Sequence, residues 1–215
     1  MTLLNIQEQK DIGKELLEKL DLLDPCVVIA GGAARDWYLG NKANDLDIYL
    51  SYHPNLTLDS NKRSIAKALS IPEDSIEILG AQFDENVDKS TEYAINPNVR
   101  CVYEFIYKGI MVQIINMHTE FVRVADFCFS ICQAWTTNCE DIRGTEAFYY
   151  SVKRKIVYKT GKFYSHKGRY IEKMMSKFPE YLFLEEKPKE ILDTKAMGVD
   201  KALKEFYSKG DIYFE

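Results

Sequence analysis

The sequence predicts an α+β fold with a mixed β-sheet, and three observations lead to this class. Residues 45–51 alternate polar and apolar side chains, as a strand with one buried face does. Residues 99–117 form two β-rich runs joined by Lys108-Gly109, which is the pattern of a hairpin. The predicted elements also run from alternating helices and strands to consecutive strands and then to helices, an order typical of α+β proteins.

Each of the other elements follows from a local pattern. Apolar residues at helical spacing predict a first helix, with Asn5 as its N-cap and Glu8 completing a capping box. Gly40 is the expected end of a short second helix, and Asp59 or Ser60 is the expected N-cap of a third. The predicted helices cover 5–23, 33–39, 59–69, 119–137 and 189–208, the predicted single strands cover 26–30, 45–51 and 75–79, and 82–98 is a predicted loop.

The alternation of side chains assigns a core face and an open face to the predicted sheet. With a two-residue hairpin loop, Glu104 lies opposite Gln113 on one face. The other hairpin face is more apolar and is the expected core side; its residues are Tyr103, Phe105, Tyr107, Ile110, Val112 and Ile114. In strand 45–51, Asp45 and Asp47 share the face opposite Leu46, Ile48 and Leu50. The acidic residues are therefore expected on the open face.

The composition is that of a globular protein. The chain has 215 residues, of which 46% are hydrophobic, so general disorder is excluded. It contains no apolar run long enough for a membrane-spanning helix, and its first twenty residues lack the apolar core of a secretory signal. Five cysteines, an odd number, favour free thiols and a cytoplasmic location. A zinc site of Cys128, Cys132, His118 and Cys139 is imaginable, but the apolar flanks favour buried thiols.

Residues 27–50 carry the chemistry that the sequence predicts. A strand ends in Gly31 and Gly32, and a helix begins there, which is an arrangement that accommodates an anion. About a dozen residues later, Asp45 and Asp47 point the same way on one strand. Two carboxylates beside a phosphate-binding turn suit a site for two Mg²⁺ ions that bridge triphosphate oxygens. A dinucleotide-binding turn is disfavoured, because the Gly-x-Gly-x-x-Gly pattern is absent.

Two motifs resemble those of a known family. GGAARDWYLG followed by NDLDIYL closely resembles the GG-x-x-RD…G…D-x-D signature of the tRNA nucleotidyltransferase/poly(A) polymerase head domain, in the DNA polymerase β-like nucleotidyltransferase superfamily. FCFSICQ, at 127–133, is similar to a degenerate form of the family's RDFTINA motif, with Phe127 and Cys128 in place of the arginine and aspartate. The resemblance covers residues 20–135. It implies a palm-like mixed sheet with helices on one face and the active site on the other.

The resemblance also implies roles for single residues. Gly31 and Gly32 would hold the triphosphate, and Asp45 and Asp47 would bind Mg²⁺ or Mn²⁺. Arg35 and Asp36 match the family's Arg-Asp. They would orient the turn or touch the nucleotide, and an internal ion pair between them is the structural alternative.

Gln113 departs from the superfamily pattern. Many members have a third carboxylate on a neighbouring strand, where this chain has Gln113, and an amide is neither a strong Mg²⁺ ligand nor a base. Three alternatives follow. Glu104 supplies the missing carboxylate as a catalytic residue, two carboxylates suffice, or the enzyme is weak or inactive.

The C-terminal part is the second departure. Residues 1–140 are the expected nucleotidyltransferase domain, and 141–215 are a basic, helical C-terminal extension that matches none of the family's base-selecting domains. We therefore expect a minimal, stand-alone member, of a kind plausible in a phage or a bacterial accessory locus. The segment 151–177 has nine Lys and Arg residues and one acidic residue, a local charge of +8 in a chain whose net charge is -5. Arg169 and Lys173 are its candidate triphosphate contacts.

The expected function is transfer of a nucleoside monophosphate from an NTP to a hydroxyl, with an RNA 3′ end as the favoured acceptor. Aromatic residues interleave with the bases of 151–177, which suits phosphate binding and base stacking, although a solvated charged surface is the alternative. A protein or a small molecule, as in toxin–antitoxin or aminoglycoside nucleotidyltransferases, remains open as acceptor. The competing hypothesis is a catalytically silent module that binds RNA or a partner.

Overall fold

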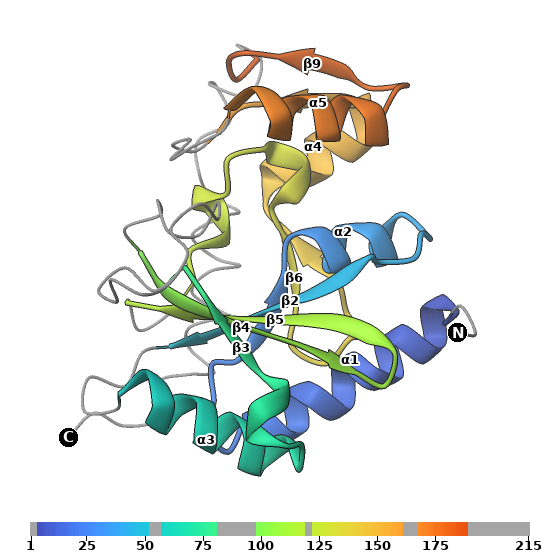
Figure 1. Cartoon of the computed structure of the whole chain (residues 1–215). Helices are drawn as coiled ribbons and strands as arrows, with labels where there is room; N and C mark the ends of the chain where they lie inside the picture. The colour runs from blue at the N-terminus through green and yellow to red at the C-terminus, as the bar shows by residue number, and fades with distance from the viewer. Residues whose placement is uncertain (1–3, 52–56, 81–97, 119–121, 161–166, 189–215) are drawn as a thin grey trace, which may run out of the picture.

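A computed structural model describes residues 4–51, 57–80, 98–118, 122–160 and 167–188 of the chain (Figure 1). The helices are α1 (Ile6–Leu20), α2 (Gly32–Tyr38), α3 (Leu58–Leu69), α4 (Glu146–Arg154) and α5 (Lys167–Lys177). The strands are β1 (Val28–Ala30), β2 (Asp45–Ser51), β3 (Glu77–Leu79), β4 (Val99–Tyr107), β5 (Ile110–Met117), β6 (Ala134–Thr136), β7 (Arg143–Gly144), β8 (Ile156–Tyr158) and β9 (Leu182–Leu184). Short 3-10 turns are η1 (Glu73–Ser75), η3 (Val124–Asp126) and η4 (Ser130–Cys132).

Seven of these strands form one mixed sheet in the order β3-β4-β5-β2-β1-β6-β7. The pair β2 and β5 is parallel, and every other neighbouring pair in this order is antiparallel. The predicted α+β class with a mixed sheet is therefore confirmed. The hairpin has the predicted register, with Glu104 opposite Gln113 and Tyr107 opposite Ile110. The strands β8 and β9 form a separate parallel pair in the C-terminal part.

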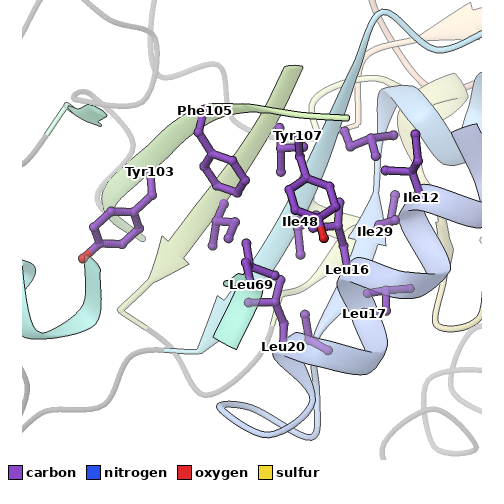
Figure 2. Packing of buried hydrophobic residues seen from close by; sticks show 14 of the residues in the cluster. Ile12, Leu16, Leu17, Leu20, Ile29, Ile48, Leu69, Tyr103, Phe105 and Tyr107 are labelled. Atoms are coloured by element: carbon purple, nitrogen blue, oxygen red, sulfur yellow. The ribbon is translucent and has the colours of Figure 1, made fainter. Parts of the chain in front are cut away.

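Helices α1 and α3 cover one face of the sheet and bury its apolar side chains (Figures 1 and 2). Leu46 and Ile48 of β2 are fully buried there against Leu16 and Leu20 of α1. Burying one such side chain contributes roughly 1.5–3 kcal/mol. The opposite face carries Asp45 and Asp47, which are half-buried. The division into a core face and an open face agrees with the alternation in the sequence.

The helix ends test the local sequence signals. Asn5 caps α1 in the predicted capping box, because its side chain accepts from the Glu8 N–H and the Glu8 side chain accepts from the Asn5 N–H. Gly40 follows α2 with a φ of 73°, as expected of a residue that ends a helix. The N-cap prediction for α3 was wrong. Thr57 is the N-cap, and its hydroxyl accepts from the Ser60 N–H.

The predicted helix over 119–137 is also wrong. Its described residues form η3, η4 and the strand β6. Apolar residues occur throughout this stretch, so periodicity alone cannot separate a buried helix from buried turns and a strand. Its polar side chains make the difference: Ser130 and Gln133 bond to groups outside the local segment.

The C-terminal elements pack on η4 and α2 around a second apolar cluster. Phe129 and Ile131 meet Phe148 of α4, Val157 of β8 and Met174 of α5 there. The predicted boundary at residue 140 stays a proposal, and β7, which joins the main sheet, lies just after it. The predicted helix at 189–208 and residues 82–97 of the predicted loop 82–98 lie outside the described residues. In the parts that are described, no helix is long and apolar enough to cross a membrane.

Candidate active site

Asp45 and Asp47 lie on β2 next to the glycine turn that ends β1. Strand β1 pairs antiparallel with β2, so the end of β1 comes alongside the start of β2. Gly31 has a φ of 84°, a conformation that favours glycine. A Cβ atom at this position would lie 4.0 Å from Oδ2 of Asp47. The structure therefore brings the predicted turn and the predicted carboxylate together.

The two glycines of the turn have different roles. The Gly31 N–H donates to the Ala134 carbonyl of β6 at 2.8 Å, so it anchors the turn to the sheet and is not the phosphate donor that the sequence suggested. Gly32 is the first residue of α2. The first N–H groups of a helix have no acceptor within the helix, so Gly32 and the two alanines after it are the remaining candidate donors to an anion.

Phe127 forms an apolar wall beside the carboxylates, which the sequence did not indicate. Its ring lies 3.4 Å from the position of a Cβ at Gly31, and its centroid is 5.6 Å from that of Tyr49. Phe127 is the residue that replaces the arginine in the family motif. In the sequence, the only sign of this apolar wall is that the residue replacing the arginine is apolar. Burial raises the pKa of the Tyr49 hydroxyl, so this neighbour of Asp47 stays neutral.

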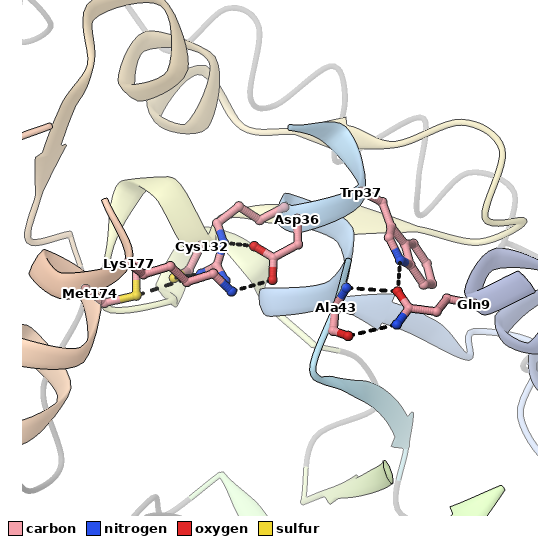
Figure 3. Close-up of polar contacts among 8 residues, drawn as sticks. Gln9, Asp36, Trp37, Ala43, Cys132, Met174 and Lys177 are labelled. Atoms are coloured by element: carbon pink, nitrogen blue, oxygen red, sulfur yellow. Dashed lines mark hydrogen bonds and ion pairs between the residues drawn. The ribbon is translucent and has the colours of Figure 1, made fainter. Parts of the chain in front are cut away.

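Gln9 of α1 fixes the backbone just before Asp45 (Figure 3). Its side-chain amide donates to the Ala43 carbonyl at 2.8 Å, and its side-chain oxygen accepts from the Ala43 N–H at 2.9 Å. The same oxygen accepts from the Trp37 indole N–H at 3.2 Å. Gln9 is buried, and it ties α1, α2 and the start of β2 together. The loop that leads into the carboxylate strand therefore has a defined path.

Arg35 and Asp36 form a buried ion pair, in agreement with the structural alternative. The Arg35 Nε donates to Oδ1 of Asp36 at 2.8 Å, and their side chains are 5% and 2% exposed. Lys177 of α5 donates to the other oxygen of Asp36 at 2.5 Å (Figure 3). The guanidinium of Arg35 also stacks over the Phe178 ring at 5.1 Å. The motif that resembles a nucleotide contact thus joins α2 to the C-terminal elements.

Gln113 and Glu104 continue the open face beyond Asp47. In β5, Gln113 pairs with Asp47 of β2 on one side and with Glu104 of β4 on the other. Its amide nitrogen donates to Oε2 of Glu104 at 2.5 Å. Both side chains are half-buried. The predicted pairing of Glu104 with Gln113 is confirmed, and Gln113 lies between Glu104 and the aspartates.

The basic segment 151–177 is less uniform than its sequence suggested. Tyr158 is fully buried, so it is not accessible for base stacking. Lys159 pairs with Glu185, and Lys177 pairs with Asp36. Lys173 is exposed on α5, whereas the side chain of Arg169, on the same helix, lies outside the described residues. The exposed bases of the described segment are Lys153, Arg154, Lys155 and Lys173.

The cysteines and histidine considered for zinc do not form a ligand cluster. Cys132 packs in the C-terminal apolar cluster, and Cys139 packs in the main core. Burial raises the pKa of the Cys139 thiol to about 12 and that of Cys101 to about 11, which is typical of inert thiols. Among the described residues, no group of three or more His, Cys, Asp and Glu side chains is placed to hold a metal ion.

Comparison with known proteins identifies the fold. No protein-family model matches the chain, and no curated protein matches its sequence. A solved structure of a CCA-adding enzyme with ATP matches 93% of this chain at a TM-score of 0.52 and 15% identity. An apo CCA-adding enzyme matches 94% at a TM-score of 0.50 and 13% identity. The chain therefore has a nucleotidyltransferase fold. More particularly, it is similar to the head portion of CCA-adding enzymes, and it spans 42% and 45% of those two chains.

Proposed function

We propose that the protein transfers a nucleoside monophosphate from an NTP to an acceptor hydroxyl. The observation that carries this proposal is the position of the Asp45 and Asp47 strand beside the glycine turn. A Cβ at residue 31 would lie between the Phe127 ring and the Asp47 carboxylate, so the glycine keeps the turn bare next to that carboxylate. The nucleotidyltransferase fold supports the same conclusion at the level of architecture.

The donor atoms of the site suit a hard divalent cation. Mg²⁺ is held in proteins by one or two carboxylates together with substrate phosphates and water, and Asp45 and Asp47 provide such a pair. When bound, Mg²⁺ or Mn²⁺ would offset the charge of the triphosphate and favour ionisation of the acceptor hydroxyl. Asp45 and Asp47 are the residues that would hold it.

The chain's own groups then have separate tasks. The N–H groups at the start of α2 bind the β- and γ-phosphates, and Phe127 and Tyr49 exclude water from one side of the carboxylates. The acceptor oxygen forms a bond to the α-phosphorus, and the bond from that phosphorus to the bridging oxygen breaks. Pyrophosphate leaves, and the hydroxyl proton passes to solvent. Arg169 and Lys173 remain proposed contacts to the triphosphate.

An RNA 3′ end is the acceptor that the surface charge supports best. Lys153 and Arg154 are exposed at the end of α4, and Tyr149 lies one turn before Lys153 on the same helix. Tyr149 is 42% exposed, and its hydroxyl accepts from the Gly144 N–H. Exposed bases beside an exposed aromatic ring suit a nucleic-acid strand. A protein or small-molecule acceptor is the alternative.

A catalytically silent binding module is the second candidate function, and Gln113 is the observation that favours it. An amide occupies the position beside Asp47 where a third carboxylate would support metal-dependent chemistry. The retained Asp45 and Asp47 argue for activity, because two like charges on one strand face are costly without a cation.

One labelling experiment separates these functions. The protein is incubated with Mg²⁺ or Mn²⁺, each labelled NTP in turn, and total cellular RNA and protein. The control is the Asp45→Ala/Asp47→Ala variant, and Asp59→Ala/Asp141→Ala is a matched control at exposed acids. Label in RNA that depends on Asp45 and Asp47 supports the proposal. Label in protein selects that acceptor instead, and no label with any NTP supports the silent module.

The salt dependence of binding tests the RNA acceptor independently of catalysis. Each phosphate that a base neutralises contributes about 0.7 to the slope of log K against log salt for a single strand. Lys153→Ala/Arg154→Ala should therefore lower the slope by about 1.4 for a labelled oligonucleotide. An unchanged slope would mean that these bases do not contact the acceptor.

A further inference from the structure

Three polar side chains stand in a row across adjacent strands on the open face of the sheet. Glu104 lies on β4, Gln113 on β5 and Asp47 on β2, and the strand registers place them directly side by side. All three are half-buried. Gln113 is the central member, so its amide separates the carboxylate of Glu104 from that of Asp47.

The hydrogen bond between Gln113 and Glu104 orients the amide. A carboxylate accepts hydrogen bonds and donates none, so Glu104 selects the NH₂ end of Gln113, and the two atoms are 2.5 Å apart. The amide oxygen is bonded to the same carbon as the nitrogen and points away from it. Fixing Nε2 on Glu104 therefore turns Oε1 away from that carboxylate, and β2 is the strand on the other side of β5.

We infer that Gln113 supplies a neutral oxygen ligand to the cation that Asp45 and Asp47 hold, and that Glu104 is a positioning residue for this amide. The inference rests on the proposed function. An amide oxygen is a weaker ligand than a carboxylate, but it can complete the coordination of a hard divalent cation beside two carboxylates, and groups that bond to a ligand commonly fix its orientation. The site then carries two negative charges at the cation, while the third acidic residue acts through a hydrogen bond.

The register favours this arrangement over direct binding by Glu104. Strands β4 and β2 are separated by β5, so the Cα atoms of Glu104 and Asp47 are roughly 10 Å apart, two strand spacings. One oxygen of the Glu104 carboxylate is already bonded to the amide. Gln113, in contrast, is the immediate neighbour of Asp47.

Binding of Mn²⁺ alone to the full chain, followed by electron paramagnetic resonance, tests the inference. Asp47→Asn should abolish binding, and Gln113→Leu should raise the dissociation constant about tenfold. Glu104→Ala should raise it several-fold, because the carboxylate that accepts from the NH₂ end of the amide is then absent. Thermal unfolding of each variant shows whether it is folded. An unchanged dissociation constant in folded Gln113→Leu overturns the inference.

A double substitution separates orientation from direct binding. Glutamate at position 113 has two equivalent oxygens and needs no orienting partner, so Gln113→Glu should bind Mn²⁺ more tightly than the natural chain. In that background, Glu104→Ala should no longer weaken binding. If Glu104→Ala weakens binding equally in both backgrounds, Glu104 is itself a ligand and the inference fails.

The outcomes also separate this inference from the proposed reaction. If the predicted Mn²⁺ affinities appear but no nucleotide is transferred, the ligand assignment holds and the reaction fails. If transfer depends on Asp45 and Asp47 while Gln113→Leu leaves both transfer and Mn²⁺ affinity unchanged, the reaction holds and the assignment fails.

Discussion

Asp36 and the pair Asp45 and Asp47 lie within eleven residues of each other in the sequence, but their environments are opposite. Asp36 is 2% exposed and bonds to two cations, Arg35 at 2.8 Å and Lys177 at 2.5 Å. Asp45 and Asp47 are half-buried and lie on one face of the same strand, so two like charges are neighbours. Asp36 is paired with two cations of the protein, whereas Asp45 and Asp47 place two like charges side by side on the open face.

This difference supports the proposal that Asp36 has a structural role in the motif and that Asp45 and Asp47 have a chemical one. A buried carboxylate needs a partner, and Asp36 has two, one of them from the C-terminal helix. Paired carboxylates that face an open surface are the arrangement expected where a cation from solution completes the site. A motif match alone would give Asp36, Asp45 and Asp47 the same functional weight. Their different burial distinguishes Asp36 from the other two.

Removing the aspartates of β2 should have the largest effect. Asp45→Asn/Asp47→Asn should lower nucleotide transfer by about three orders of magnitude or more, since the cation site is lost. The free energy of unfolding should stay equal or rise, because repulsion between the two carboxylates is removed. Initial rates and urea unfolding measure the two quantities. If this variant loses both activity and stability, Asp45 and Asp47 also have a structural role, and the contrast with Asp36 fails.

Removing Asp36 should have the opposite effect, a loss of stability and not a specific loss of nucleotide transfer. Asp36→Ala leaves the guanidinium of Arg35 buried without its carboxylate, so the free energy of unfolding should fall by about 3–5 kcal/mol. Asp59→Ala, at an exposed position on α3, is the control and should change it by less than about 0.5 kcal/mol. Urea unfolding followed by tryptophan fluorescence measures this. If stability is unchanged while the KM for the NTP rises, Asp36 contacts the nucleotide after all.

The same contrast shows how far the sequence could predict the site. The β2 alternation and the two-residue turn are local, and they predicted the faces and the pairing of Glu104 with Gln113. The Lys177–Asp36 bond joins residues 141 positions apart, and no local pattern reports such a contact. The segment 119–137 was misjudged for the same reason, since Gln133 bonds to Thr160 and the Tyr158 N–H donates to Ser130. Its folded form depends on distant partners.

Replacing Lys177 tests how much the C-terminal helix α5 contributes to stability, and we expect a smaller loss than for Asp36→Ala. Lys177→Met removes one of the two partners of Asp36 and keeps Arg35, so unfolding should become easier by about 1–2 kcal/mol. Lys173→Met, one turn earlier and exposed on the same helix, is the matched control and should have little effect on stability. Equal effects of the two substitutions would show that the Lys177–Asp36 pair adds nothing beyond the general charge of α5.

Glu15 forms ion pairs that are more exposed than those of Asp36, so we expect a smaller contribution to the free energy of unfolding. This contribution depends on pH. Hydrogen bonds from Lys108 and then Lys19 lower the pKa of its carboxyl from 4.5 to about 2. A lowered pKa stabilises the fold at pH values above 4.5, and this stabilisation is lost as the pH falls toward 2. Because the side chain is 31% exposed, we expect Glu15→Gln to cost only about 1 kcal/mol at neutral pH.

Urea unfolding of the natural chain and Glu15→Gln between pH 7 and pH 3 measures this dependence. The difference between the two should shrink steadily below pH 4.5, because the carboxylate that distinguishes them becomes protonated in the unfolded state first. Glu18→Gln, at an exposed position on the same helix, is the matched control. A difference that stays constant down to pH 3 would mean that Glu15 acts through packing. Of the two ion pairs compared, only the buried Arg35–Asp36 pair would then stabilise the fold through its charges.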